Sequence, residues 1–218
     1  GMYVNTESIN KQFAKKHFDY DDGALFKCDA SGMFCDTTGT PPGGYPGLTW
    51  YGSNDSTLYY SSYDRKSEHG WKELIDMIYA LNFTPAILDS FINIDRVLWA
   101  FAVNTVVGNF DTYNGYYVHN YYMYQTEDGL FQMIPWDLSQ SFINALLGWD
   151  IFTPMGANHP AHYDPYYGAD PTLYRPLTAY LFNNANYRRQ YTAHLRTVIS
   201  ELDTNQIRAE VQNMQAMA

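Results

Sequence analysis

The feature that most limits the fold of this chain is an apolar helix that must stop at a fixed point. Residues 93–107 are almost continuously apolar, which predicts a helix buried on most of its sides, with Asn93 as its N-cap. Gly108 follows at once, and a glycine in this place is typical of a helix C-terminus. The loop Asn109–Asp111 is therefore predicted to start from a rigid support, which suits a residue that must be held for chemistry.

A β-hairpin pattern follows this loop. Residues 117–124 and 130–134 predict two strands, and the Glu-Asp-Gly sequence at residues 127–129 is typical of a turn between them. The second strand leads into Asp137, so the hairpin is expected to bring Asp137 beside Asp111. Two acids that are distant in sequence would then face one pocket.

The composition excludes two classes of partner. The chain has 13 Lys and Arg residues against 23 Asp and Glu residues, a formal net charge of -10. Because phosphate backbones are bound by Lys and Arg, we expect neither a nucleic acid nor an anionic membrane as partner. No apolar run approaches the roughly 20 residues that cross a bilayer, so no membrane span is predicted. An acidic chain that handles nucleotide phosphate would need a divalent cation.

The remaining elements are predicted from periodicity and turn signals. Residues 29–56 are rich in Gly, Pro, Ser and Thr and predict a long surface loop, and the irregular aromatic residues 148–174 predict another. Further strands are expected at Met2–Ile9, Ala24–Cys28 and Thr57–Ser61, and further helices at Asn10–Phe18, Trp71–Asn82, about Pro176–Leu202 with a break near Asn183–Asn186, and Thr204–Ala216.

The cysteines and histidines leave alternatives open. A disulfide between Cys28 and Cys35 would close a small loop and indicate an oxidising compartment, and the alternative is two unrelated free thiols. Two cysteines without a second pair nearby do not form a zinc site. Residues 159–164 offer two imidazoles and an acid that could hold a transition metal, although a proline between the histidines breaks the helix that a metalloprotease-type pair requires.

The chemistry that the residues alone favour is centred on the two acids. Asp111 at the end of a buried helix suits a general base or an acid that positions a substrate. Magnesium prefers oxygen ligands, and Asp137 with the amide oxygen of Asn120 would supply two of them. The alternative is that these side chains only cap turns.

Three sequence blocks resemble the signature blocks of the CotH family, a group of atypical kinases named for a bacterial spore-coat protein. They are Gly-Asn-Phe-Asp at residues 108–111, His-Asn-Tyr-Tyr-Met-Tyr at residues 119–124 and Ile-Pro-Trp-Asp-Leu at residues 134–138. The resemblance spans most of the chain, and three ordered blocks make it specific. It also covers Gly1-x-Tyr3, Glu7-x-Ile9-x-Lys11-x-Phe13, Gly23-x-Leu25-Phe26-Lys27 and Arg175-Pro176-Leu177.

The resemblance implies an α+β, kinase-like fold in which residues 1–218 form one domain, a mostly helical large lobe with a β-hairpin bearing the site. The chain opens at what resembles the middle of the family domain, so the N-terminal small lobe is expected to be largely missing. The implied reaction transfers the γ-phosphoryl group of ATP to a hydroxyl of a secreted or surface protein, with Mg²⁺ or Mn²⁺ as cofactor. This fragment alone is expected to bind nucleotide weakly or to be inactive, and the implied location is extracellular, on the cell surface or in the spore coat.

Individual residues take roles by the same resemblance. Asp111 corresponds to the catalytic-loop acid that positions the acceptor hydroxyl, and Asp137 to the metal-binding acid that follows a hairpin. Asn120 is the candidate second metal ligand, with an amide that only holds the hairpin as the alternative. His119 is expected to be a hydrogen-bonded structural residue. Ser139 stands where the family commonly repeats an acid, so one metal contact is expected to be missing or supplied by water. Three further residues match family positions near the expected nucleotide end of the cleft, although either lysine could equally be a solvated surface charge: Glu7, Lys11 and Lys27.

Two other classes of function fit the residues. Acidic charge, many aromatics and paired carboxylates would suit a glycoside hydrolase or a sugar-binding module, with Asp111 and Asp137 as acid and base. A non-catalytic kinase-like scaffold that binds a partner protein is the third hypothesis. Metal-promoted nucleotide binding would favour the kinase, and sugar binding that a chelator does not affect would favour the carbohydrate function.

Overall fold

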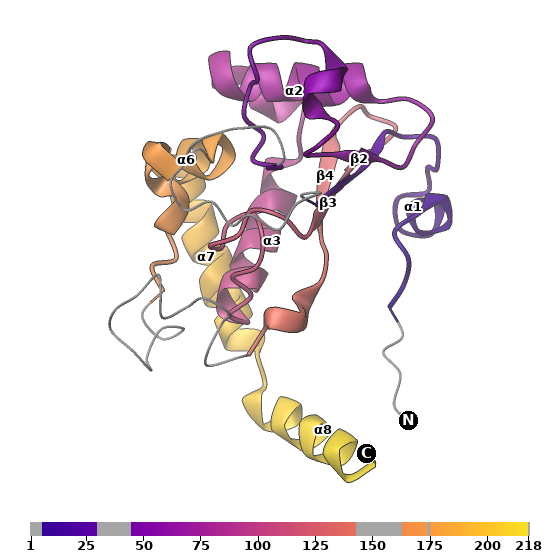
Figure 1. The fold of residues 1–218 in the computed structure, drawn as a ribbon. Coiled ribbons are helices and arrows are strands. Elements are labelled where there is room, and N and C mark those ends of the chain that lie inside the picture. Colours follow the sequence, from indigo (N-terminus) through magenta and orange to yellow (C-terminus); the bar gives the residue numbers. More distant parts are fainter. Residues whose placement is uncertain (1–5, 30–44, 143–162, 174, 218) are drawn as a thin grey trace.

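The computed structural model describes residues 6–29, 45–142, 163–173 and 175–217. These residues form an α+β fold around a four-stranded antiparallel sheet of strand order β2-β1-β3-β4. Strands β3 and β4 are the predicted hairpin, and β1 joins them on the other side of β3 (Figure 1). The strands are β1 (Leu25–Cys28), β2 (Asp64–Arg65), β3 (Tyr121–Gln125) and β4 (Phe131–Pro135).

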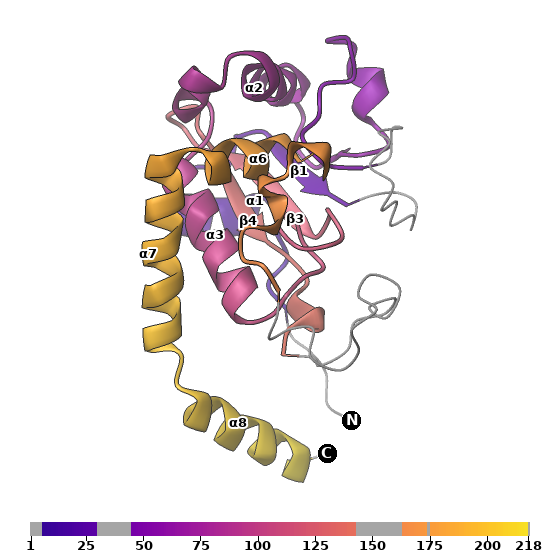
Figure 2. The same ribbon diagram turned by 90° about the vertical axis from the view of Figure 1, so that its left-hand side faces the viewer.

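Alternation along the strands gives the sheet two buried faces. Phe26, Met123 and Met133 lie on the face that packs against the main core, which the helices α2 and α3 complete. Leu25 and Tyr122 lie on the opposite face, which α1 covers. Figures 1 and 2 show α1 on one side of the sheet and α3, α6 and α7 on the other. Burial on both faces explains why most residues of β1, β3 and β4 are apolar or aromatic, whereas the two residues of the edge strand β2 are charged and exposed.

The helices surround this sheet. α7 packs along α3, where the hydroxyls of Thr105 and Tyr191 lie 2.9 Å apart and the rings of Trp99 and His194 stack at 4.0 Å. α8 has no buried residue and extends away from the other elements in both views (Figures 1 and 2). The helices are α1 (Lys11–Phe18), α2 (Trp71–Phe83), α3 (Ile94–Val106), α6 (Pro176–Asn183), α7 (Ala185–Glu201) and α8 (Thr204–Met217).

The predicted helices are confirmed, together with the predicted Asn93 cap. The Asn93 side chain accepts a hydrogen bond of 3.1 Å from the Arg96 amide at the start of α3. The Asp203 side chain does the same for the Asn205 amide at 2.9 Å, at the start of α8.

None of the described helices is long and apolar enough to cross a membrane.

Two predicted strands are wrong in the part that the structure describes. Residues 57–61 overlap a 3-10 helix, Ser56–Tyr59, because the Asp55 carboxylate accepts a hydrogen bond of 3.0 Å from the Thr57 amide and favours a local turn. Residues 6–9 of the predicted strand Met2–Ile9 are not in a strand, and residues 1–5 lie outside the described residues.

The hairpin is confirmed, but its first strand begins at Tyr121 rather than at Tyr117. The Tyr117 amide turns back toward the Phe110 carbonyl oxygen, 3.4 Å away. Asn120 then takes a left-handed backbone conformation with a φ of 56°. Residues 117–120 therefore belong to the loop that carries Asp111.

The predicted long surface loop at residues 29–56 is partly buried. The Leu48 side chain is fully buried, and the Leu48 amide donates to the Tyr63 hydroxyl at 2.8 Å. The Tyr113 hydroxyl donates to the Gly47 carbonyl at 2.9 Å, which ties this segment to the loop after α3. Residues 30–44 lie outside the described residues, as do 148–162 and 174 of the second predicted loop. Residues 163–173 contain two short 3-10 helices, Tyr167–Ala169 and Pro171–Leu173.

The two predictions about cysteines and histidines are tested only in part. Cys28 is a free thiol, fully buried in the core, and burial raises its pKa well above the ordinary value. Cys35 lies outside the described residues, and so do both histidines of the candidate metal site at residues 159–164.

Buried tyrosines make the fold sensitive to alkali. Burial raises the pKa of Tyr124 from 10.0 to about 12, and it raises the pKa of Tyr63 and Tyr121 well above 10.0. A folded-state pKa above the unfolded value stabilises the protein fully below pH 10, and this stability is lost as the pH rises through about 12. We expect cooperative unfolding between these pH values, with circular dichroism and tyrosinate absorbance changing together. Tyrosinate absorbance that rises smoothly from pH 10 while the circular dichroism stays native would contradict this prediction.

Candidate active site

The loop that carries Asp111 starts from the end of α3. Gly108 has a φ of 69°, a left-handed conformation that a glycine adopts without strain, and it ends the helix as predicted. The Asn109 amide then donates to the Asn104 carbonyl oxygen at 2.8 Å, which turns the chain back onto the helix. Both asparagine side chains are buried. The start of the loop is therefore part of the protein core.

Buried polar side chains fix the rest of this loop to α3. The Asn109 amide nitrogen donates to the Asn104 side-chain oxygen at 3.3 Å, and Asn104 donates to the Thr112 hydroxyl at 3.3 Å. Asn114 donates to the Thr105 hydroxyl at 3.0 Å. Because hydrogen bonds between buried groups are costly to break, they hold the loop in one conformation. Asp111 is thus presented from a rigid support, as the sequence predicted.

The Asp111 carboxylate is held at both of its oxygens. Oδ1 lies 3.1 Å from His119 Nε2, and Oδ2 accepts a hydrogen bond of 3.1 Å from the amide nitrogen of Asn120. The same amide nitrogen lies 3.1 Å from the Asp111 carbonyl oxygen. The Asp111 side chain is 19% exposed, so it remains accessible to a substrate. The His119 ring nitrogen therefore contacts the candidate catalytic acid as an ion-pair partner, and the role of His119 as a hydrogen-bonded structural residue stays a prediction.

Asp137 lies at the same end of the hairpin. Tyr121 pairs with Pro135, and one residue further the Trp136 amide donates to the Asn120 carbonyl oxygen at 3.1 Å. Asp137 follows directly, is exposed, and has a left-handed backbone with a φ of 50°. Its Oδ1 accepts a hydrogen bond of 3.1 Å from the Ser139 amide. Asn120 therefore lies between the two acids. Its side chain contacts Asp111, and its backbone carbonyl contacts Trp136, the residue before Asp137.

A second anchor brings the segment after Asp137 back to α3. The Phe142 amide donates to the Val107 carbonyl oxygen at 2.8 Å. Residues 137–141 are thus held between the end of the hairpin and the end of α3, which are also the two supports of the Asp111 loop. These contacts place both acids at the same end of the hairpin, and the expectation that they face one pocket stays a prediction.

Two oxygen donors at this end of the hairpin are candidates for binding a magnesium ion. Asp137 supplies an exposed carboxylate, and because the Asn120 amide nitrogen is committed to Asp111, its amide oxygen is the atom that could bind a cation. Among the described residues no three His, Cys, Asp or Glu side chains are grouped to hold a metal. Magnesium is commonly bound by one or two protein oxygens with substrate phosphates and water completing the shell, so this small set suits a metal that arrives with a nucleotide.

Lys27 lies on β1, beside the hairpin. Cys28 pairs with Tyr121, so Asp29 follows β1 at the same end of the sheet where Asn120 precedes β3. Lys27 forms an ion pair with Asp29, and this hydrogen bond raises the pKa of the lysine.

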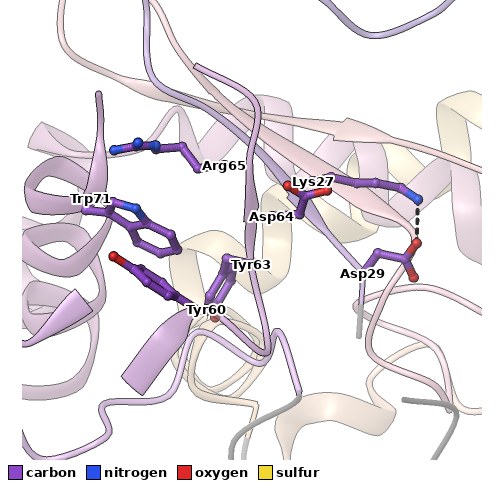
Figure 3. A pocket seen from close by; sticks show the side chains of 7 residues that line it. All are labelled: Lys27, Asp29, Tyr60, Tyr63, Asp64, Arg65 and Trp71. Atoms are coloured by element: carbon purple, nitrogen blue, oxygen red, sulfur yellow. Dashed lines mark hydrogen bonds and ion pairs between the residues drawn. The ribbon is translucent and has the colours of Figure 1, made fainter. Parts of the chain in front are cut away.

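A cavity of about 640 Å³ lies next to Lys27 (Figure 3). An aromatic pair lies on its wall, in which Tyr60 is exposed, Trp71 is half-buried and the two ring centroids are 4.8 Å apart. Figure 3 shows this pair beside Arg65 on one side, and Lys27, Asp29 and Asp64 on the other. The cavity therefore combines charges of both signs with an aromatic surface.

Glu7 and Lys11 lie next to α1 and at its first residue. Glu7 pairs with Lys16 at 2.9 Å and with His17 at 3.0 Å, and the hydrogen bond from Lys16 is the main cause that lowers the pKa of Glu7. Lys11 lies 4.0 Å from Glu68, with both side chains more than half exposed. All three ion pairs are at the surface, and none of them includes Asp111 or the residues that contact its carboxylate. A nucleotide role for Glu7 and Lys11 stays a prediction.

Sequence reasoning missed two groups that the structure adds. The sequence does not indicate the aromatic pair Tyr60 and Trp71, because the segment of the 3-10 helix Ser56–Tyr59 has the pattern of a strand. The buried Arg175 was noted only as part of a matching block, and the proline after it signals a helix start but not a buried charge. In both cases the group depends on contacts between segments that are distant in the sequence, and no spacing in the sequence predicts such contacts.

Comparison with known proteins identifies the family. The family model described as CotH kinase protein matches residues 1–218. The chain is similar to the inner spore coat protein H of Bacillus subtilis, with 25% identity over 94% of this chain and 51% of that protein. The chain therefore spans about half the length of this relative. Because the family model matches the whole sequence, the chain belongs to the CotH kinase protein family.

Proposed function

We propose that this protein transfers the γ-phosphoryl group of ATP to a hydroxyl group of another protein, as a CotH-type atypical kinase. The observation that carries the proposal is the arrangement of Asp111, Asn120 and Asp137 at one end of the β3–β4 hairpin, in the order expected of a phosphoryl-transfer site. The membership in the CotH kinase protein family supports the same reaction.

Asp111 positions the acceptor in this proposal. Its carboxylate is oriented by His119 and Asn120 and remains partly accessible, so it can accept a hydrogen bond from the acceptor hydroxyl. In the reaction the hydroxyl oxygen forms a bond to the γ-phosphorus, the bond from that phosphorus to the bridging oxygen breaks, and ADP leaves. The hydroxyl proton passes to Asp111. The rigid attachment of the loop to α3 reduces the cost of reaching this geometry.

Asp137 and the amide oxygen of Asn120 would hold the metal. Mg²⁺ or Mn²⁺, when bound there, would neutralise the charge that develops on the phosphate during transfer. Ser139 adds no carboxylate to this pair, and its amide instead orients Asp137. The other positions around the metal are left to phosphate and water.

Lys27 and the adjacent cavity form the nucleotide end of the site in this proposal. The Lys27 ammonium can exchange its ion pair with Asp29 for a contact with phosphate, and the Tyr60 and Trp71 rings offer a surface for a planar base. The Bacillus subtilis relative is a spore coat protein, and we propose an acceptor in the spore coat or at another extracellular surface.

Metal-dependent nucleotide binding tests the function. We expect full-length protein to bind ATP in isothermal titration calorimetry when magnesium or manganese is present, and to lose most of this binding when EDTA is added. An intact fold without any ATP binding under either condition would contradict the proposal and would favour a non-catalytic scaffold.

Replacement of Lys27 by Met tests the nucleotide end. We expect the dissociation constant of Mg-ATP to rise about tenfold or more, because a charge-assisted hydrogen bond to phosphate contributes roughly 1.5–3 kcal/mol. Lys72→Met is the matched control, because Lys72 also pairs with a nearby acid, Asp76, but lies exposed on α2. Equal affinities of the two variants would remove Lys27 from the site and leave the roles of Asp111 and Asp137 to be tested separately.

A carbohydrate-binding function is the second candidate, and the cavity is the observation that favours it. Tyr60 and Trp71 form a tilted aromatic pair in a cavity that the carboxylates of Asp29 and Asp64 also line, and a cavity with aromatic rings and acids suits sugar ring faces and hydroxyls. The two functions differ in their need for metal. Binding of oligosaccharides that persists in EDTA, together with no binding of ATP, would favour this candidate.

A further inference from the structure

A buried arginine holds the turn that follows Asp111. The Arg175 side chain comes from the residue before α6 and is only 3% exposed. Its Nη1 donates to the Gly115 carbonyl oxygen and lies 3.4 Å from the Tyr113 carbonyl oxygen, and its Nη2 donates to the Tyr116 carbonyl oxygen at 2.6 Å. All three acceptors lie on one turn of the Asp111 loop.

The charge of Arg175 is not balanced by an acid in the described part of the chain. The ion pairs found there do not include this guanidinium, and its Nε has no hydrogen-bond partner there. A buried cation without a carboxylate is costly, so the carbonyl oxygens of the turn are its main compensation. The face of the Tyr167 ring, 5.4 Å away, adds a cation–π contact. The energy of burying this charge is therefore coupled to the conformation of the turn.

The turn is in contact with the backbone that carries Asp111. The Tyr116 amide donates to the Phe110 carbonyl oxygen at 2.7 Å, and the Gly115 amide donates to the Thr112 carbonyl oxygen at 2.9 Å. Phe110 directly precedes Asp111. A side chain at Gly115 would collide with the Phe110 carbonyl, which shows how closely the turn lies against that peptide. A shift of the turn would therefore move the peptide from which the Asp111 side chain starts.

α6 reaches the same turn a second time. The Leu177 amide at the start of α6 donates to the Tyr113 hydroxyl at 3.3 Å. We infer that Arg175 is a positioning residue that fixes the Asp111 loop in its active conformation through the carbonyl oxygens of Tyr113, Gly115 and Tyr116. This inference rests on the proposed phosphoryl-transfer function, but its structural part can be tested without it.

The variant Arg175→Lys tests the inference. A lysine keeps the charge, but a single ammonium group cannot reproduce the planar fork that reaches several carbonyl oxygens in fixed directions. We expect kcat for phosphoryl transfer by the full-length protein to fall at least tenfold, while KM for ATP stays within about twofold because Asp137 and Lys27 are untouched. The matched control is Arg188→Lys, since Arg188 also lies over a tyrosine ring, Tyr166, at 3.8 Å and donates to a backbone carbonyl, but outside the Asp111 loop.

Hydrogen exchange of the backbone amides provides a second readout that does not depend on activity. We expect the amides of Gly115 and Tyr116 to exchange faster in Arg175→Lys than in the wild type, while amides in the middle of α3 exchange at unchanged rates. Arg188→Lys is expected to leave Gly115 and Tyr116 unchanged. A wild type that transfers no phosphate would count against the proposed function alone, because the exchange rates would still show whether Arg175 holds the turn.

Two results would overturn the inference. One is unchanged exchange at Gly115 and Tyr116 in Arg175→Lys. The other is faster exchange spread evenly over the loop and α3, with kcat reduced equally in Arg175→Lys and Arg188→Lys, because a general loss of stability would then explain both variants.

Discussion

Asp111→Asn in the full-length protein is expected to lower the rate of phosphoryl transfer about a thousandfold. An amide at this position keeps the size of the side chain, but it cannot take the proton of the acceptor hydroxyl, and general-base catalysis commonly contributes between a hundredfold and ten-thousandfold. The affinity for Mg-ATP should stay within about threefold, because the metal ligands are other residues. The measurement is single-turnover transfer from ATP at saturating metal, together with calorimetric titration of ATP.

The hairpin itself offers a control for this variant. Asp128 lies at the opposite end of the hairpin, where its carboxylate accepts hydrogen bonds from the Thr126 hydroxyl at 2.6 Å and the Leu130 amide at 3.2 Å. Asp128→Asn changes the charge and the turn but not the proposed site, so its transfer rate should remain close to that of the wild type. If Asp111→Asn and Asp128→Asn had similar rates, Asp111 would not be the acceptor-positioning acid.

Asp137→Asn is expected to weaken the binding of Mg-ATP about a hundredfold and to abolish transfer. The loss of residues that only support metal ligands commonly costs 10- to 100-fold in metal affinity, and loss of a direct ligand should cost at least as much. The fold should be preserved, because an asparagine can still accept the hydrogen bond from the Ser139 amide that Asp137 accepts.

Chelation gives the comparison for this second variant. Wild-type protein in EDTA should bind ATP as weakly as Asp137→Asn does in magnesium, because both conditions remove the same metal. Unchanged metal-dependent affinity in Asp137→Asn would place the metal elsewhere. Circular dichroism and the unfolding temperature of the variant should match those of the wild type.

The parts of the fold that could be predicted are those determined by local chemistry. The helix that ends at Gly108 was predicted because its apolar run, its Asn93 cap and its terminal glycine all lie next to one another in the sequence. The hairpin was predicted because the Glu-Asp-Gly turn lies between two aromatic strands. Local signals also misled, as at residues 57–61, where the Asp55 side chain stabilises a 3-10 helix and the aromatic pattern had indicated a strand.

The parts that could not be predicted depend on contacts between distant segments. The pairing of β1 with β3, which brings Lys27 next to Tyr122, joins residues on either side of two helices. Nothing in a single sequence specifies that pairing. The position of Asp111 and Asp137 at one end of the hairpin could be anticipated, but the contacts that orient Asp111, from His119 and through the turn held by Arg175, needed the folded structure.

Transfer of labelled phosphate from ATP tests the central claim most directly. Full-length protein with manganese or magnesium is incubated with spore-coat protein, the proposed acceptor, and with ATP labelled at either the γ- or the α-phosphate. We expect label in protein hydroxyl groups only from the γ-phosphate, strongly reduced label with Asp111→Asn and none with Asp137→Asn. Undiminished γ-label with both variants, or label that enters only from the α-phosphate, would contradict the account.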